Sequence, residues 1–171
     1  MKEKVLRSTH KIETEAIFSE CGNYRYSLSR SVAGKDGKMT FIMFNPNVRD
    51  DIQLGATANY CFNYAIENKY GKVEIVNLFA LRTKSIRALK EKVKNNGIDP
   101  VGPLNNYYIQ KSIQNSDKIV LAWGSNGGFN RRDREVLKLL NDSTLFCFSK
   151  SRKGKPGYPK RSMDIDITLF D

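Results

Sequence analysis

Histidine and paired cysteines are what this sequence has least of. Its 171 residues include one histidine, His10, and three cysteines. Cys21, Cys61 and Cys147 have no CxxC spacing, which excludes a zinc knuckle and argues against Cys/His or Ser/His catalysis. Cys61 and Cys147 fall inside apolar patterns, so we expect small core residues in a reducing compartment. No metal site is therefore expected.

Long hydrophobic runs are absent as well. No apolar stretch approaches the roughly 20 residues of a membrane helix, and the N-terminus has no apolar signal-peptide core. Neither a Walker A motif nor GxGxxG is present, so we expect no NTPase, no dinucleotide enzyme and no cofactor. The sequence predicts a cytoplasmic protein without a membrane partner.

Positive charge is in excess. The sequence has 29 Lys and Arg residues against 18 Asp and Glu residues, a formal net charge of +11. This excess favours a polyanionic partner, nucleic acid before anionic membrane. The alternative is a basic cytosolic protein that binds no DNA. The length fits one domain, residues 1–171, in which residues 1–14 form a loose arm or a first irregular turn.

The apolar run Met39 to Phe44 predicts a strand that is buried on both faces of a sheet. The strand should end at Asn45-Pro46, because proline cannot donate to a strand ladder. A buried strand that ends in such a polar loop is where α/β proteins usually keep their chemistry. Its carboxyl end is a first candidate site, and an ordinary strand-to-loop exit is the alternative.

Apolar strands and amphipathic helices alternate along the rest of the chain. A period of two over residues 24–32 predicts a β-hairpin with its turn at residues 20–23. Further strands are predicted at 73–76, 118–123 and 144–148, and helices around 61–66, 85–97, 104–115 and 131–140. Because parallel neighbours need crossover connections, this order predicts a three-layer α/β/α fold with a four-stranded parallel core sheet and an N-terminal β-hairpin extension.

The predicted strand ends bring polar or glycine-rich loops to one edge of such a sheet. Backbone N–H groups in a glycine-rich loop at a helix start can hold a phosphate. The candidate phosphate-binding residues here are Gly124, Ser125, Asn126, Gly127 and Arg131. A basic loop after the last strand adds the candidate DNA-binding residues Arg152, Lys153, Lys155, Lys160 and Arg161. A solvated charged loop is the alternative.

Three more side chains near the strand ends are candidates for chemistry. The amide of Asn77 can present one donor and one acceptor side by side to the edge of a nucleobase. Asp50 and Asp51 can orient a water molecule. The alternatives are a strand-end Asn that bonds to its own loop, and two carboxylates in a surface turn.

The order of several short motifs resembles a known family. The motifs are YRYSLSR at 24–30, FNPN at 44–47, VNLFA at 76–80, AWG at 122–124 and GKP at 154–156. Across almost the whole chain they resemble an uncharacterised bacterial and phage family, number 1643 among the domains of unknown function. That resemblance implies no activity.

The same edge is similar, more distantly, to the uracil-DNA glycosylase superfamily, whose fold it implies. There, a first strand ends in a Gly-x-Asp/Asn-Pro loop that positions the attacking water, which implies this catalytic role for Asn45. A second strand ends in an Asn that reads the flipped base, which falls on Asn77. The third strand carries Leu-Trp-Gly, to which residues 120–124 are similar. The base pocket implied by the resemblance also includes Phe44, Phe79 and Tyr158.

Two departures from that superfamily bear on catalysis. Tyr158 precedes Pro159 where a His-Pro-Ser loop is usual, so the electrophilic imidazole is missing. Asn45 in place of Asp would position water but could not act as a base. Three hypotheses follow, with DNA as the expected partner in the first. They are a glycosylase for a damaged, mismatched or modified DNA base, a nucleic-acid-binding protein without chemistry, and a hydrolase or binder of free nucleotides.

Overall fold

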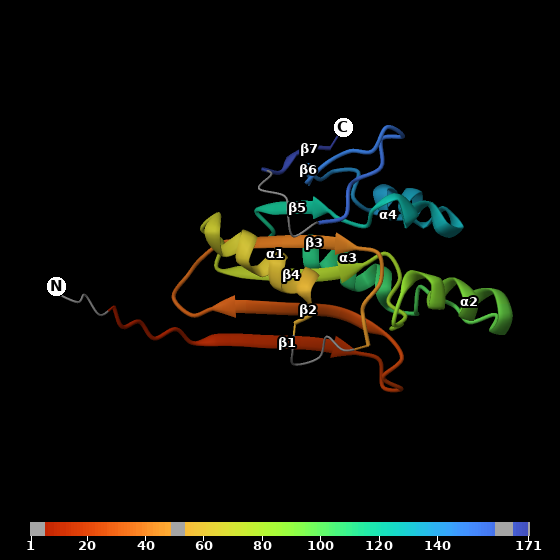
Figure 1. The fold of residues 1–171 in the computed structure, drawn as a ribbon, viewed down its shortest axis with the longest axis horizontal. Coiled ribbons are helices and arrows are strands. Elements are labelled where there is room, and N and C mark those ends of the chain that lie inside the picture. Colours follow the sequence, from red (N-terminus) through yellow and green to blue (C-terminus); the bar gives the residue numbers. More distant parts are fainter. Residues whose placement is uncertain (1–5, 49–53, 160–165, 171) are drawn as a thin grey trace, which may run out of the picture.

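The computed structural model describes residues 6–48, 54–159 and 166–170 of a mixed α/β fold, as Figure 1 shows. One sheet of seven strands has the order β1-β2-β4-β3-β5-β6-β7. The strands are β1 (Ile12–Phe18), β2 (Arg25–Val32), β3 (Lys38–Met43), β4 (Lys72–Asn77), β5 (Lys118–Leu121), β6 (Leu145–Cys147) and β7 (Thr168–Leu169). The helices are α1 (Ala56–Glu67), α2 (Ile86–Asn96), α3 (Asn105–Ile113), the 3₁₀ segment η1 (Ser125–Arg131) and α4 (Arg132–Leu139).

Parallel pairing runs through the middle of the sheet. Strand β3 pairs in parallel with β4 on one side and with β5 on the other, and β5 pairs in parallel with β6. Strands β1 and β2 form the predicted antiparallel hairpin, β2 continues antiparallel onto β4, and β7 is antiparallel to β6. The carboxyl ends of β3, β4, β5 and β6 therefore lie along one edge, called the carboxyl edge below.

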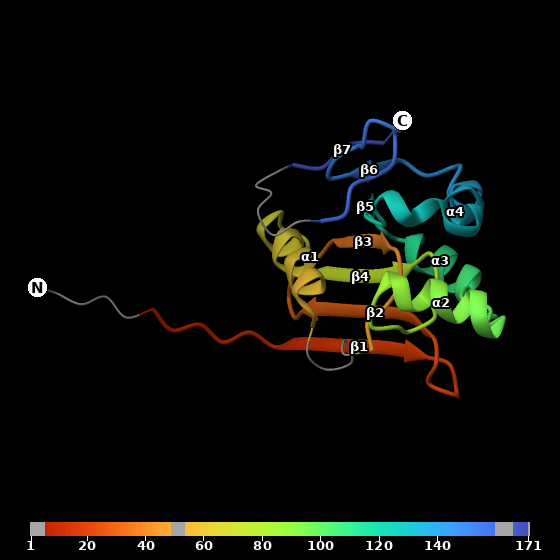
Figure 2. The same cartoon turned by 45° about the vertical axis from the view of Figure 1, so that its right-hand side comes forward.

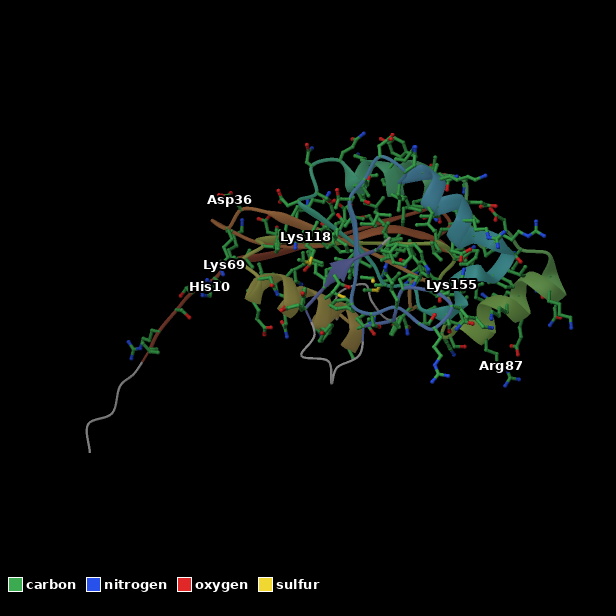
Figure 3. All side chains as sticks on the ribbon, turned by 90° about the horizontal axis from the view of Figure 1, so that it is seen from above. His10, Asp36, Lys69, Arg87, Lys118 and Lys155 are labelled. Atoms are coloured by element: carbon green, nitrogen blue, oxygen red, sulfur yellow. The ribbon has the colours of Figure 1, made fainter. Side chains whose placement is uncertain are left out.

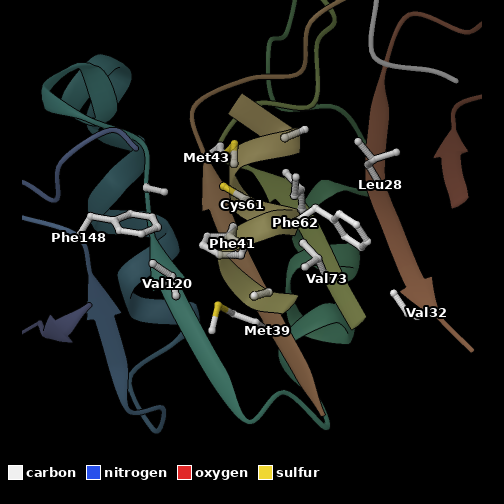
Figure 4. Packing of buried hydrophobic residues seen from close by; sticks show 14 residues of the cluster. Leu28, Val32, Met39, Phe41, Met43, Cys61, Phe62, Val73, Val120 and Phe148 are labelled. Carbon is white, nitrogen blue, oxygen red and sulfur yellow. The ribbon is translucent and has the colours of Figure 1, made fainter. Parts of the chain in front are cut away.

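Helices cover both faces of this sheet, with α1 on one face and α2, α3 and α4 on the other (Figure 2). On the α1 face, Phe41, Cys61 and Phe62 belong to one buried cluster, seen from close by in Figure 4. On the opposite face, Leu89 and Ile109 from α2 and α3 pack into a second cluster. The apolar positions of β3 alternate between the two clusters, so the strand is buried on both faces as its sequence predicts.

The connections that follow β3 and β4 diverge. The chain leaves β3 for α1 on one face of the sheet and leaves β4 for α2 on the opposite face. Where neighbouring parallel strands send their connections to opposite faces, a crevice opens outside their carboxyl ends. The fold thus creates space beside the ends of β3 and β4.

Several sequence-based expectations are corrected or lie outside the described residues. Strand β1 begins at Ile12, within the stretch expected to be a loose arm. The sequence did not predict β7 or η1. The candidate residues Asp50, Asp51, Lys160 and Arg161 lie outside the described residues. Within the described ranges, no helix has the length and apolar character needed to cross a membrane.

Candidate functional site

A cavity of about 360 Å³ opens at the carboxyl edge, where the ends of β3 and β4 face the first turns of α1 and α2. Its size is within the range of small-molecule sites. The polar side chains that line it are Arg25, Asn45, Asn47, Thr57, Asn77, Thr83, Lys84, Ser85 and Tyr158. We call it the strand-end cavity.

Asn77 ends β4 at the inner wall of the strand-end cavity. Its side chain is 2 % exposed, and its Oδ1 atom accepts no hydrogen bond from any described residue. Its backbone is held firmly, because Nδ2 of the buried Asn105 donates over 3.0 Å to the carbonyls of both Asn77 and Leu78. A buried amide oxygen without a donor is costly, and the Oδ1 of Asn77 at the cavity wall is able to accept a hydrogen bond from a molecule in the cavity.

Asn45 follows β3 and is oriented by three acceptors. Its Nδ2 donates to the hydroxyl of Thr83 over 2.9 Å, to the carbonyl of Pro46 over 3.1 Å and to that of Leu81 over 3.5 Å. Carbonyls can only accept, so the amide nitrogen must face them and Oδ1 must face away. Since Asn45 lines the strand-end cavity, this orientation makes its Oδ1 an acceptor on the side away from these three contacts.

Arg25 enters the strand-end cavity because β2 is bulged. Along β1, Ile17 pairs with Ser27 and Phe18 with Arg25, so Tyr26 is the extra residue. A bulge shifts the alternation of side chains by one. Tyr26 consequently stacks on Tyr108 of α3, with ring centroids 5.1 Å apart, on the sheet face opposite α1. Arg25 instead lines the cavity beside α1, although only 2 % of it is exposed.

Two helices begin at the strand-end cavity. The hydroxyl of Ser85 caps α2 by accepting from the N–H of Ala88 over 3.1 Å. No side chain caps α1, and neither helix has an acidic residue in its first turn. Helix N-termini carry partial positive charge, and Arg25 and Lys84 add two cations to the lining. The electrostatics of the cavity therefore suit a ligand with a negative group.

Tyr158 divides the strand-end cavity from a second cavity of about 220 Å³ at the ends of β3 and β5. Its ring is 42 % exposed, and its hydroxyl lies 3.0 Å from Oγ1 of Thr57 in α1. The second cavity is lined by Phe44, Trp123, Gly124, Ser125 and Asn126, together with residues shared with the first. Tyr158 is thus positioned where a planar ligand group could stack.

Phe79 and Gly127 were predicted as site residues, and the structure places them behind the cavities. Phe79 is fully buried and packs on Phe44, with ring centroids 5.1 Å apart. Gly127 is buried against the indole of Trp123, where a Cβ atom would come within 2.2 Å of Cδ1. Neither lines a cavity described above, so both support the site through packing. Arg131 is exposed where α4 begins.

The basic loop is an ordered turn after β6. The N–H of Ser151 donates to the carbonyl of Lys155 over 2.8 Å, and Arg152 and Lys153 are exposed at its tip. The ammonium of Lys155 forms an ion pair with Asp133, a carboxylate whose side chain is 3 % exposed. Lys155 therefore neutralises a buried charge of the protein itself, while Arg152 and Lys153 face solvent.

Comparison with known families decides the family of the chain. Residues 25–160 match the model of the family described as "Protein of unknown function (DUF1643)". The chain belongs to the DUF1643 family. The DUF1643 segment contains every residue that lines the strand-end cavity, from Arg25 to Tyr158. No curated protein and no solved structure matches the chain.

Sequence reasoning missed three residues of this candidate site. Arg25 sits in a strand of alternating polarity, and only the bulge reveals that it enters the cavity. Thr83 and Asn105 orient Asn45 and Asn77 from distant parts of the chain. The available signal was that both residues are polar and lie next to apolar segments. Their hydrogen-bond partners are distant in the sequence and are brought close only by the tertiary fold. Within the described ranges, no group of three or more His, Cys, Asp or Glu side chains could hold a metal ion.

Proposed function

We propose that the strand-end cavity receives a nucleobase flipped out of DNA, and that this DUF1643 protein hydrolyses the N-glycosidic bond of a damaged, mismatched or modified base. The observation that carries the proposal is Asn77, a buried amide whose Oδ1 lacks a donor at the wall of a cavity. The edge of a pyrimidine offers such a donor at a ring or exocyclic nitrogen. The uracil-DNA-glycosylase-like resemblance also assigns base reading to this Asn.

The other lining residues support that chemistry in distinct roles. Asn45, held by Thr83, directs Oδ1 into the cavity and can accept a hydrogen bond from the attacking water. The amide of Asn77 can also donate to a base oxygen, which stabilises negative charge as the base leaves. The uncapped start of α1 can face the phosphate of the same nucleotide. Tyr158 offers its ring for stacking on the extruded base.

In the part of the chain that the structure describes, the strand-end cavity has no evident general base, and this observation favours a second candidate function. None of the described residues that line the strand-end cavity is Asp, Glu or His, and the amide of Asn45 cannot take a proton from water. This favours, as the second candidate, a protein that binds a flipped base in DNA without cutting the bond. The two functions predict the same binding variants and different products.

Base release from defined oligonucleotides tests the proposal. Duplex and single-stranded DNA carrying uracil, mismatched thymine or a hydroxymethylated pyrimidine is incubated with the protein, and abasic sites are revealed by alkaline cleavage. We expect strand breaks at one of these bases, reduced about 10²–10³-fold in Asn77→Ala, as for loss of a donor to a developing anion. Asn45→Ala should lower the rate as well.

The matched control is Asn141→Ala, an exposed Asn that lies outside both cavities. It should leave base release unchanged. Intact strands, together with DNA binding that Asn77→Ala weakens for a modified base, would replace the glycosylase by the second candidate. Base release unchanged in both Asn45→Ala and Asn77→Ala would refute the assignment of the site.

A further inference from the structure

Helix α2 presents a row of cations on the face turned away from its buried side chain Leu89. Arg87, Lys90 and Lys94 line an open groove along this face. The one acidic residue in the groove, Glu91, accepts a hydrogen bond over 2.8 Å from Nε of Arg87, one turn earlier. The groove therefore keeps a net positive charge.

This groove is continuous with the two cavities at the carboxyl edge. Ile86 lines the groove and both cavities, and Asn126 lines the groove and the second cavity. A path thus leads from Asn77, past Tyr158 and Asn126, to Lys90 and Lys94. Because of these shared walls, a chain-like ligand with one group in the strand-end cavity can follow the groove with its next groups.

Lys90 is held at the junction of the groove with the second cavity. Its ammonium donates to Oδ1 of Asn126 over 2.8 Å and lies 5.4 Å from the ring centroid of Phe129. These contacts fix the cation at the groove before any ligand arrives, so less side-chain freedom is lost on binding. Figure 3 shows Arg87 at the end of the molecule opposite Lys69 and Lys118.

We infer that the α2 groove binds the phosphodiester backbone of a DNA strand that flanks the base in the strand-end cavity. This inference rests on the proposed function only in assuming that one base of the bound strand occupies the strand-end cavity. Arg87 and Lys94 are seven residues apart, a rise of roughly 10 Å along the helix. At about 3.4 Å per nucleotide, that length matches roughly three nucleotides of one strand.

Salt-dependent binding of an unmodified strand tests the inference apart from any base chemistry. A fluorescent single-stranded DNA with no candidate target base is titrated with protein, by anisotropy, across a series of salt concentrations. In Lys90→Glu/Lys94→Glu we expect the affinity at low salt to fall about tenfold or more. Since each neutralised phosphate contributes about 0.7 to the slope of log K against log salt, the slope should flatten by roughly 1.4.

The control Lys69→Glu/Lys92→Glu makes the same change in net charge. Lys92 lies on α2 but outside the groove, and Lys69 follows α1 at the other end of the molecule (Figure 3). We expect the control to bind within about threefold of the wild type. Because Lys90 contacts Phe129, Arg87→Glu/Lys94→Glu provides a second test with two exposed side chains.

Three results would overturn the inference. They are equal losses in the groove and control variants, wild-type binding in both groove variants, and no binding of DNA by the wild type. The outcome is separable from the proposed function, because the groove is tested by binding of an unmodified strand and the proposed function by base release. If the groove variants weaken DNA binding but the wild type releases no base, the inference about the groove stands and only the glycosylase assignment is refuted.

Discussion

The side-chain amide of Asn45 donates to the hydroxyl of Thr83 over 2.9 Å, and that hydroxyl donates in turn to the carbonyl of Ser85 over 2.8 Å. The end of β3 is thereby connected to the start of α2 through a single buried oxygen. Thr83 has no direct chemical role in this arrangement. It fixes which end of the Asn45 amide faces the strand-end cavity.

Thr83→Val should uncouple Asn45 while it preserves side-chain shape. Loss of the hydroxyl removes the best acceptor of the Asn45 amide, so the amide can rotate and present nitrogen to the cavity. We expect base release, or binding of a base-modified strand, to fall about tenfold, with the free energy of unfolding lowered by about 1–2 kcal/mol in urea titrations. Thr83→Ser keeps the hydroxyl and should recover most of the function. Equal behaviour of the two variants would contradict this role.

Asn105→Leu should destabilise the end of β4. Asn105 donates to the carbonyls of Asn77 and Leu78, and Nε of Arg132 also donates to Leu78 over 2.9 Å. Only the carbonyl of Asn77 therefore loses its donor, which predicts a loss of about 1–3 kcal/mol in the free energy of unfolding. Denaturant unfolding measures this, and Asn141→Leu on the surface serves as the comparison. A change below about 0.5 kcal/mol would show that the clamp on β4 is dispensable.

Lys155→Met should cost stability more than nucleic-acid affinity. The substitution leaves the carboxylate of Asp133 buried, with the N–H of Arg134 still donating to it. Removing one partner of a buried pair is strongly destabilising, and partial exposure of Lys155 reduces the effect to about 1–3 kcal/mol. The double variant Lys155→Met/Asp133→Asn should recover part of this loss. If Lys155→Met instead weakened DNA binding without affecting unfolding, the lysine would be a phosphate contact.

Tyr158→His should raise the rate of base release. An imidazole at the boundary of the two cavities supplies the electrophile that the uracil-DNA-glycosylase-like resemblance leads one to expect there. Acid catalysis of this kind typically contributes about 10²–10⁴-fold, and we expect a gain of at least about tenfold. Tyr158→Phe removes only the hydroxyl that contacts Thr57 and should not produce the gain. Slower base release by Tyr158→His than by the wild type would argue that the tyrosine has its own role.

The cysteines should differ in reactivity with pH. The hydroxyl of Ser19, 3.3 Å from Sγ of Cys21, lowers the pKa of this exposed thiol, whereas burial raises the pKa of Cys61. The thiolate is the reactive form, so Cys21 should be alkylated first, at a pH below that of an ordinary thiol. Mass spectrometry of iodoacetamide-treated protein measures this, and Ser19→Ala should move the profile to higher pH. Labelling of Cys61 in the folded protein would contradict the prediction.

The sequence predicted those parts of the fold that rest on local patterns. The apolar run of β3, its stop at Pro46 and the Ser85 cap of α2 are readable because each depends on neighbours in the chain. The short strand β7 was not predicted, since two residues carry no period. β1 extends back to Ile12 because its charged residues pair with β2. The local sequence pattern of residues 12–15 does not indicate this pairing.

The candidate site divides along the same line. The sequence predicted Asn45 and Asn77 at one edge of the sheet, because the carboxyl ends of parallel strands share an edge, whereas Tyr158 was predicted from the family resemblance; all three line the strand-end cavity. Phe44 and Phe79 each follow a buried strand and look alike in the sequence. Only the tertiary packing shows that Phe44 lines the second cavity and that Phe79 packs behind it. Lys155 has the sequence character of a phosphate ligand, yet it pairs with Asp133, which lies in α4 and not in the basic loop.

The extra residue in β2 has a consequence for how this chain tolerates insertions and deletions. The pairing of β1 with β2 is regular from Ser27 onward. Only the side chain of Arg25, on the other side of Tyr26, has its direction set by the extra residue. Inserting one residue between Ile17 and Phe18 would give Tyr26 a partner, restore regular alternation and turn the guanidinium of Arg25 toward α3, without a substitution at any residue of the cavity. The number of residues in β1 relative to β2, as much as their identity, therefore determines whether Arg25 places its charge inside the cavity.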